Sequence, residues 1–98
     1  MRETIQKRAP ADLRQEAIGG RLKSIREAYG LKPSEIADKL GVERTYWSRW
    51  ETGARPIPID MAYALTQMFE VDLDYVLSGD LRAVPLDVRE RLATASAS

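Results

Sequence analysis

Four glycines divide the chain into short segments, and each segment before a glycine has the apolar spacing of an amphipathic helix. These glycines are Gly30, Gly41, Gly53 and Gly79. A glycine directly after the last apolar position of a helical pattern commonly ends the helix, because glycine adopts left-handed backbone angles without a steric penalty. No stretch alternates apolar and polar residues over the length of a strand. The sequence therefore predicts an all-α fold built from short helices.

The first helix is predicted from Asp12 to Gly30. Asp12 is a good N-cap residue, and Gln15 three positions later completes a capping-box pattern. Gly19 and Gly20 interrupt the apolar face, so we expect this helix to fray or bend before them.

Two shorter helices joined by a glycine-containing turn come next. Pro33 stands in the first turn of the second helix, which ends at Gly41. The third helix runs from about Arg44 to Thr52 and ends at Gly53. Two short helices with such a turn between them define a helix-turn-helix.

The rest of the chain predicts a fourth helix from Asp60 to about Phe69 and a short fifth helix capped by Asp72. Residues 86–95 could form a sixth helix that faces solvent or a partner. At 98 residues the chain has room for one small domain.

Three zones are expected along the chain. Residues 1–11 form a flexible N-terminal arm, residues 12–79 form the folded domain, and residues 80–98 form a short C-terminal tail that is partly helical. The arm is basic, and it either stays unordered or wraps around DNA.

Composition excludes several classes of function. The chain has no Cys and no His, so disulfides, zinc–thiolate sites, cysteine nucleophiles and a histidine general base are all excluded. No apolar run approaches the ~20 residues of a membrane span, and the N-terminus lacks the apolar core of a secretion signal. We therefore expect a cytoplasmic binding protein rather than an enzyme, with no cofactor and no bound metal.

The charged side chains are unevenly distributed, although fifteen basic and fifteen acidic residues give a net charge of zero. Residues 19–55 have a net charge of +3, whereas residues 56–81 contain no Lys or Arg and have a net charge of −5. The balance disfavours indiscriminate binding to nucleic acid, but it allows specific binding through the basic segment.

Residues 18–53 (IGGRLKSIREAYGLKPSEIADKLGVERTYWSRWETG) resemble the Cro/C1 repressor-type, or XRE-family, helix-turn-helix, and residues 58–79 resemble its two closing helices. The features that carry the resemblance are Leu22, Arg26, Gly30-Leu31, Ile36-Ala37, Leu40-Gly41-Val42, Ser48-Arg49, Glu51, Gly53 and Leu73-Asp74-Tyr75. The resemblance implies a compact five-helix domain whose third helix lies in the DNA major groove, in a transcriptional regulator.

The third helix has the composition that this role needs. Its period directs Trp47 and Trp50 to the core, and the opposite face carries candidate base-reading residues. These are Glu43, Arg44, Thr45, Ser48 and Arg49. Arginine pairs with O6 and N7 of guanine. Glu43 either accepts from a cytosine amino group or stabilises the helix N-terminus by its charge.

Phosphate contacts are predicted from residues around this helix. The candidates are Lys32, Ser34, Tyr46, Thr52 and Arg55. Tyr46 either contacts a phosphate or packs in part against the domain. Pro33 stands where the family commonly has glutamine, which removes one N–H from the start of the second helix. The resemblance also implies a partly buried ion pair between Arg26 and Glu51.

One subunit has few cations to contact phosphates, so its own affinity for DNA should be modest. We therefore predict a homodimer that binds a palindromic DNA operator. The candidate dimer contacts are Met61, Phe69, Val71 and Leu73. The alternative function is a protein-interaction module, such as an antitoxin or adaptor, that contacts its partner through residues 60–98.

Overall fold

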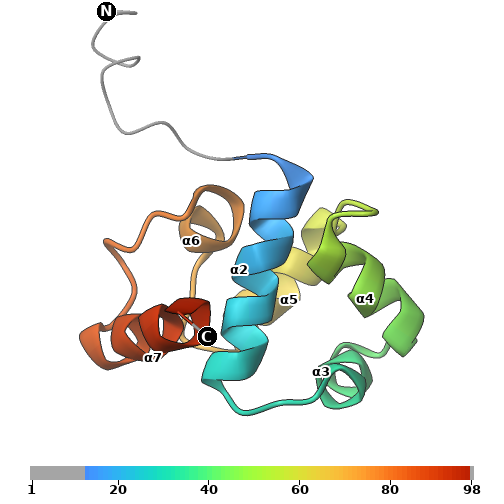
Figure 1. Cartoon of the computed structure of the whole chain (residues 1–98), viewed down its shortest axis with the longest axis horizontal. Coiled ribbons are helices and arrows are strands. Elements are labelled where there is room, and N and C mark those ends of the chain that lie inside the picture. The colour runs from blue at the N-terminus through green and yellow to red at the C-terminus, as the bar shows by residue number, and fades with distance from the viewer. Residues whose placement is uncertain (1–12, 98) are drawn as a thin grey trace, which may run out of the picture.

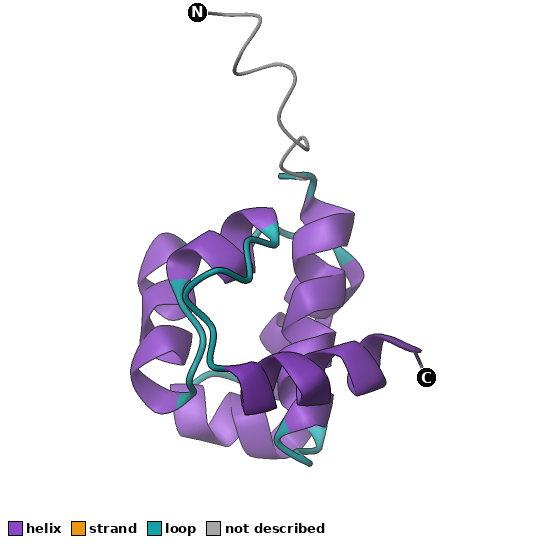
Figure 2. Cartoon of the chain, turned by 90° about the vertical axis from the view of Figure 1, so that its left-hand side faces the viewer, coloured by secondary structure: helices purple, strands orange, loops and turns teal. Residues whose placement is uncertain are grey.

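The computed structural model describes residues 13–97, which form six helices and no strand (Figures 1 and 2). The helices are α2 (Gln15–Ala28), α3 (Pro33–Leu40), α4 (Arg44–Thr52), α5 (Ile59–Met68), α6 (Leu73–Ser78) and α7 (Leu86–Ala97). The all-α prediction is confirmed for the described residues. The predicted arm, residues 1–11, lies outside them.

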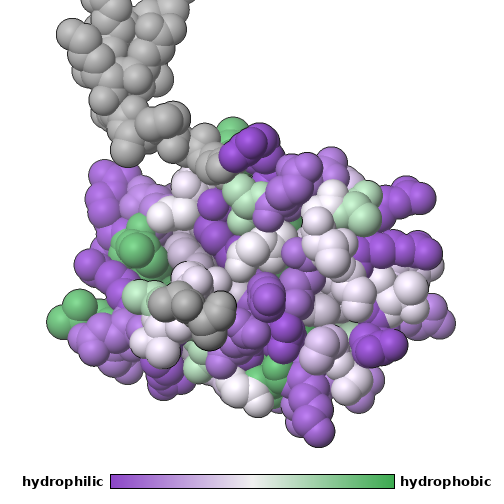
Figure 3. Space-filling view, in the orientation of Figure 1, coloured by the Kyte–Doolittle hydropathy of each residue, from purple (hydrophilic) through white to green (hydrophobic). Residues whose placement is uncertain are grey.

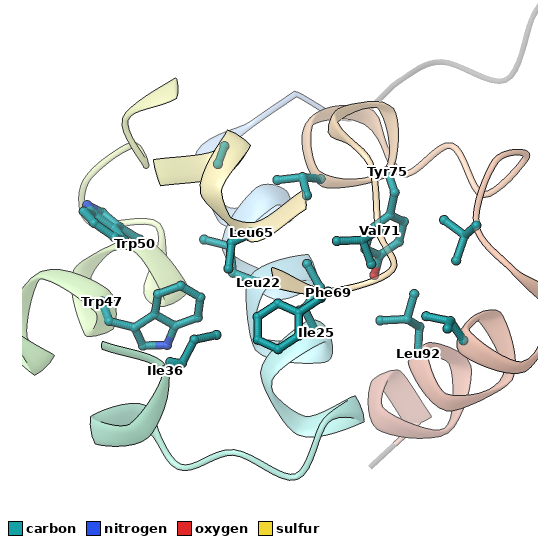
Figure 4. Close-up of a cluster of buried hydrophobic side chains, with 14 of the residues drawn as sticks. Leu22, Ile25, Ile36, Trp47, Trp50, Leu65, Phe69, Val71, Tyr75 and Leu92 are labelled. Atoms are coloured by element: carbon teal, nitrogen blue, oxygen red, sulfur yellow. The ribbon is translucent and has the colours of Figure 1, made fainter. Parts of the chain in front are cut away.

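Helix α2 occupies the centre of the domain. Figure 1 shows α3 and α4 on one side of it and α6 and α7 on the other, and α2 contacts α4, α6 and α7 directly. The buried apolar side chains form one continuous cluster, which in Figure 4 extends from Trp47 and Trp50, past Leu22 and Ile25, to Leu92. A single core of this size suits a domain of about 100 residues.

The predicted start of the first helix is wrong. Helix α2 begins at Gln15 with Arg14 as its N-cap, whereas the prediction placed the cap at Asp12, which is not among the described residues. The helix also continues through Gly19 and Gly20 without a break. Tertiary contacts therefore override the low helix propensity of the two glycines.

Helices α3, α4 and α6 match their predicted positions. Gly41 and Gly53 follow α3 and α4 with φ angles of 73° and 82°, which are left-handed values that favour glycine. The Asp72 side chain accepts a hydrogen bond from the Tyr75 backbone N–H at 3.3 Å, so Asp72 caps α6 as predicted.

Helix α5 differs slightly from its predicted extent and face. It runs from Ile59 to Met68, and Ala62 and Leu65 are its fully buried residues. Met68 was predicted to lie on the apolar face but is 38% exposed. Phe69, just beyond the helix, enters the core instead.

The expectation that α7 faces solvent or a partner is wrong. Val88 and Leu92 of α7, and Val84 just before it, are almost completely buried, so α7 packs into the core against α2. Their four-residue spacing makes only a narrow apolar stripe, which is a weak helical signal in the sequence. The guanidinium of Arg91 also lies 5.1 Å from the centre of the Tyr29 ring, in a cation–π contact with α2's C-cap residue.

Within residues 13–97, none of the helices combines the length and the apolar composition that crossing a membrane requires.

Candidate nucleic-acid interface

A tight turn holds α3 and α4 against each other. The Val42 backbone N–H donates to the Ala37 carbonyl at 3.0 Å, immediately after the left-handed Gly41. Ala37 is 1% exposed, and its small side chain lets the two helices approach closely. The geometry of the turn therefore fixes how α4 projects from the domain.

The inner face of α4 is anchored by two tryptophans. Trp47 and Trp50 are both buried, and their rings meet edge to face with centroids 6.2 Å apart. Such aromatic pairs add to the stability that burial alone provides. This anchoring leaves the opposite face of α4 exposed and fixed in direction.

The outer face of α4 carries the side chains predicted to read bases. Helical geometry places four of them, together with the predicted phosphate contact Thr52, within an arc of about 140°, on the side opposite the tryptophans. They are Arg44, Thr45, Ser48, Arg49 and Thr52. Four of these are exposed and Ser48 is half-buried. Thr52 is the last residue of α4, as predicted, and lies on this face.

Two further candidates lie at the edges of this face. Glu43 is the N-cap residue of α4, is exposed, and makes no side-chain capping hydrogen bond. Tyr46 is 50% exposed, which leaves its hydroxyl accessible to a ligand. Figure 3 shows a largely hydrophilic molecular face on which apolar residues occur as separate spots.

The arginines of residues 13–97 fall into two groups. Six have an interaction within the protein: Arg14, Arg21, Arg26, Arg82, Arg89 and Arg91. In the same part of the chain, no partner exists for the guanidinium groups of Arg44, Arg49 and Arg55. All three belong to α4 or the loop that follows it. Their hydrogen-bond donors are therefore available to a ligand.

An ion pair between Arg26 and Glu51 joins α2 to α4. The Arg26 Nε and Nη2 atoms donate to the two Glu51 carboxylate oxygens at 2.9 and 2.8 Å, and Nη1 donates to the Leu31 carbonyl at 2.9 Å. The Trp47 indole N–H donates to the same carboxylate. The hydrogen bond that Arg26 donates to Glu51 is the main cause of the raised pKa of Arg26. Glu51 thus serves the domain's own structure.

A close backbone approach, which the sequence did not reveal, also joins these two helices. A Cβ atom added at Gly19 would press on the Glu51 carbonyl oxygen and lie 2.7 Å from that of Trp50. The end of α4 is equally close, because a Cβ at Gly53 would lie 2.8 Å from the Cα of Glu16. The sequence feature that could have indicated this approach is the pair Gly19 and Gly20 within a helical pattern. We interpreted that pair instead as a place where the helix frays or bends.

The start of α3 is a less favourable phosphate site than predicted. The Lys32 backbone N–H donates to the Glu35 carboxylate at 2.7 Å, and Pro33 has no N–H. A negative charge therefore lies at the end of the helix where a phosphate would be attracted. Lys32 and Ser34 themselves are exposed.

Two of the predicted dimer contacts are wrong. Phe69 is 9% and Val71 is 5% exposed, and both pack in the core. Met61 and Leu73 are half-buried against that core. The exposed large apolar residues of α5 are Ile59, Tyr63 and Met68. Ile59 and Tyr63 are four positions apart and lie on one face of the helix.

Comparison with known proteins places this architecture in a family. Residues 17–77 match the family described as "Helix-turn-helix domain". The chain is 31% identical over 75 residues to the "Propionyl-CoA carboxylase regulator" of Cereibacter sphaeroides, covering 76% of this chain and 16% of that protein. No solved structure matches significantly.

Two other relatives are named as helix-turn-helix regulators. A "Putative HTH-type transcriptional regulatory protein" of Pyrococcus furiosus is 40% identical over 55 residues, covering 56% of this chain and 18% of the relative. The "Uncharacterized HTH-type transcriptional regulator YobD" of Bacillus subtilis is 28% identical over 57 residues, covering 58% of this chain and 51% of the relative. The chain thus spans about half or less of these relatives. Since the family match covers well over half of the chain, and the predicted resemblance to Cro/C1-type repressors agrees with it, the chain belongs to the helix-turn-helix domain family.

Proposed function

We propose that the chain is a sequence-specific double-stranded DNA-binding domain of a transcriptional regulator, with α4 in the major groove. The observation that carries the proposal is the outer face of α4 and its loop, where Arg44, Arg49 and Arg55 are exposed and without partners within residues 13–97. The names of the relatives, all of them regulators, support the same class of function.

The residues divide by the chemistry they can perform. Base edges are contacted from the outer face and start of α4, by Glu43, Arg44, Thr45, Ser48 and Arg49. Phosphates are contacted by residues at the edge of α4 and in the segments before and after it, namely Lys32, Ser34, Tyr46, Thr52 and Arg55. Phosphate contacts fix the register on the duplex, and base contacts supply the specificity.

The protein acts as a homodimer on a palindromic operator in this proposal. One subunit has few cations for phosphates, and each neutralised phosphate contributes a salt slope of only about 0.9. The face of α5 around Ile59 and Tyr63 suits contact with a second copy, because Asp60 is the only charged residue of that helix. A two-fold contact brings like residues together, so an uncharged face avoids repulsion.

Selection of bound sequences from a random duplex DNA pool tests the proposal. We expect one enriched palindromic motif with half-site centres about 34–36 Å apart. Sedimentation of the complex should show two protein chains per duplex. Failure to enrich any sequence would contradict sequence-specific binding, whereas an asymmetric motif bound by a monomer would contradict only the dimer.

Glu35→Gln should tighten DNA binding. The amide oxygen of glutamine keeps an acceptor for the Lys32 N–H, while the charge that repels a phosphate at the start of α3 is removed. A charge at a helix end is worth about 0.3–1 kcal/mol, so affinity should rise roughly two- to five-fold. Fluorescence anisotropy with the selected duplex measures this change.

Glu90→Gln is the matched control, because Glu90 is exposed on α7 and its replacement changes the net charge equally. We expect it to change affinity much less. Equal gains from both variants would mean that no phosphate approaches α3.

A further inference from the structure

We infer that the operator is read through guanine, with Arg44 and Arg49 each pairing with O6 and N7 of a guanine in a separate G·C pair of the half-site. The inference rests on the proposed function and adds to it the base identity that the helix selects.

The side-chain inventory of α4 favours guanine over adenine. Bidentate recognition of adenine requires Asn or Gln, and bidentate recognition of guanine requires Arg or Lys. Helix α4 has the sequence RTYWSRWET, which contains no Asn, Gln or Lys. Its two long polar side chains on the outer face are Arg44 and Arg49. The helix therefore has two side chains that can form bidentate hydrogen bonds with guanine and none that can do so with adenine.

Both guanidinium groups are free to pair. Arg26 on α2 shows the contrast, since three of its nitrogen atoms already donate to Glu51 and Leu31. No such bond engages the Arg44 or Arg49 side chain in residues 13–97. A planar guanidinium fork with unused donors matches the two acceptors on the major-groove edge of guanine.

The spacing of the two arginines assigns them to different base pairs. Five residues correspond to about 7.5 Å along the helix axis and about 140° around it. This rise equals about two steps of roughly 3.4 Å between base pairs. Thr45 and Ser48 lie between the arginines and carry single hydroxyls, which discriminate less than a bidentate fork. Each half-site should therefore contain two strongly selected guanines separated by less selective positions.

The test compares wild type, Arg44→Ala and Arg49→Ala in the random-pool selection and then on modified duplexes. The wild-type motif should contain two invariant G·C pairs per half-site. Each alanine variant should lose preference at one of them, by roughly five- to 150-fold. Arg55→Ala is the control, because loss of a phosphate contact weakens binding to all sequences alike.

Base analogues identify the atoms involved. Replacing either guanine by 7-deazaguanine removes N7 and should weaken wild-type binding, but should not further weaken the variant that lacks the matching arginine. Inosine keeps O6 and N7 and should bind as guanine does. An enriched motif without invariant guanines, or unchanged guanine preference in both variants, would overturn the inference while DNA binding stands. Absence of any enriched motif would overturn both.

Discussion

Glu51→Ala is expected to lower the free energy of unfolding by about 3–5 kcal/mol. The Glu51 carboxylate accepts hydrogen bonds from Arg26 and from the Trp47 indole N–H. The side chains of Arg26 and Glu51 are only 11% and 13% exposed, so alanine leaves a largely buried positive charge and an indole N–H without an acceptor. Such a loss is a large fraction of the roughly 5–15 kcal/mol that stabilises a typical domain.

Urea unfolding followed by tryptophan fluorescence measures the effect, because Trp47 and Trp50 are buried. Glu43→Ala is the matched control at the exposed start of the same helix, and it should change stability far less. The double variant Arg26→Ala/Glu51→Ala should cost less than the sum of the two single changes, because the pair is lost only once. Additive single effects, or equal losses from Glu51→Ala and Glu43→Ala, would show that the ion pair does not hold α4 in place.

Gly19→Ala is expected to destabilise the domain by about 2–3 kcal/mol. The added methyl group would meet the Glu51 carbonyl oxygen, lie 2.7 Å from the Trp50 carbonyl oxygen and 2.9 Å from the Glu51 carbonyl carbon. All three are backbone atoms, so no side-chain rotation relieves the overlap, and α2 and α4 must move apart. Overpacking of this kind typically costs 1–3 kcal/mol. For a domain of this size, the melting temperature should fall by about 10–20 °C.

Gly20→Ala is the control one position along the same helix. Among the described residues, no atom beyond its chain neighbours and its own helix backbone lies within 4 Å of a Cβ added there, so only the helix propensity changes. Alanine is favoured over glycine inside a helix by about 0.5–1 kcal/mol, and the melting temperature should rise by a few degrees. Thermal unfolding by circular dichroism compares the two variants. Similar shifts for both would contradict the close approach of α2 and α4.

Much of the helix-turn-helix could be predicted from local signals. Pro33, Gly41 and Gly53 are start and stop signals that depend only on the backbone preferences of their own residues, and α3 and α4 lie where they predict. The two faces of α4 were also predictable, because Trp47 and Trp50 recur at helical spacing. The partners of Arg26 and Glu51 could be expected only from the family resemblance, since 25 positions separate them.

The errors arose where distant segments meet. Phe69 and Val71 were predicted to form a dimer surface. An apolar residue can pack either in its own domain's core or against a second subunit, and the sequence does not distinguish the two. The structure places them in the core. Helix α7 was assigned to solvent or a partner because its apolar stripe is narrow, yet Val88 and Leu92 pack into the same core. In both cases the deciding contact comes from another helix.

Local composition and spacing are therefore sufficient for the helical class, the helix-turn-helix and the exposed outer face of α4, because these follow from the short-range preferences of glycine, proline and the tryptophan pair. The fold in three dimensions was needed to show that Gly19 lets α2 and α4 touch, that α7 completes the core, and which arginines are already engaged. Those features depend on contacts between residues far apart in the chain, which no local pattern records.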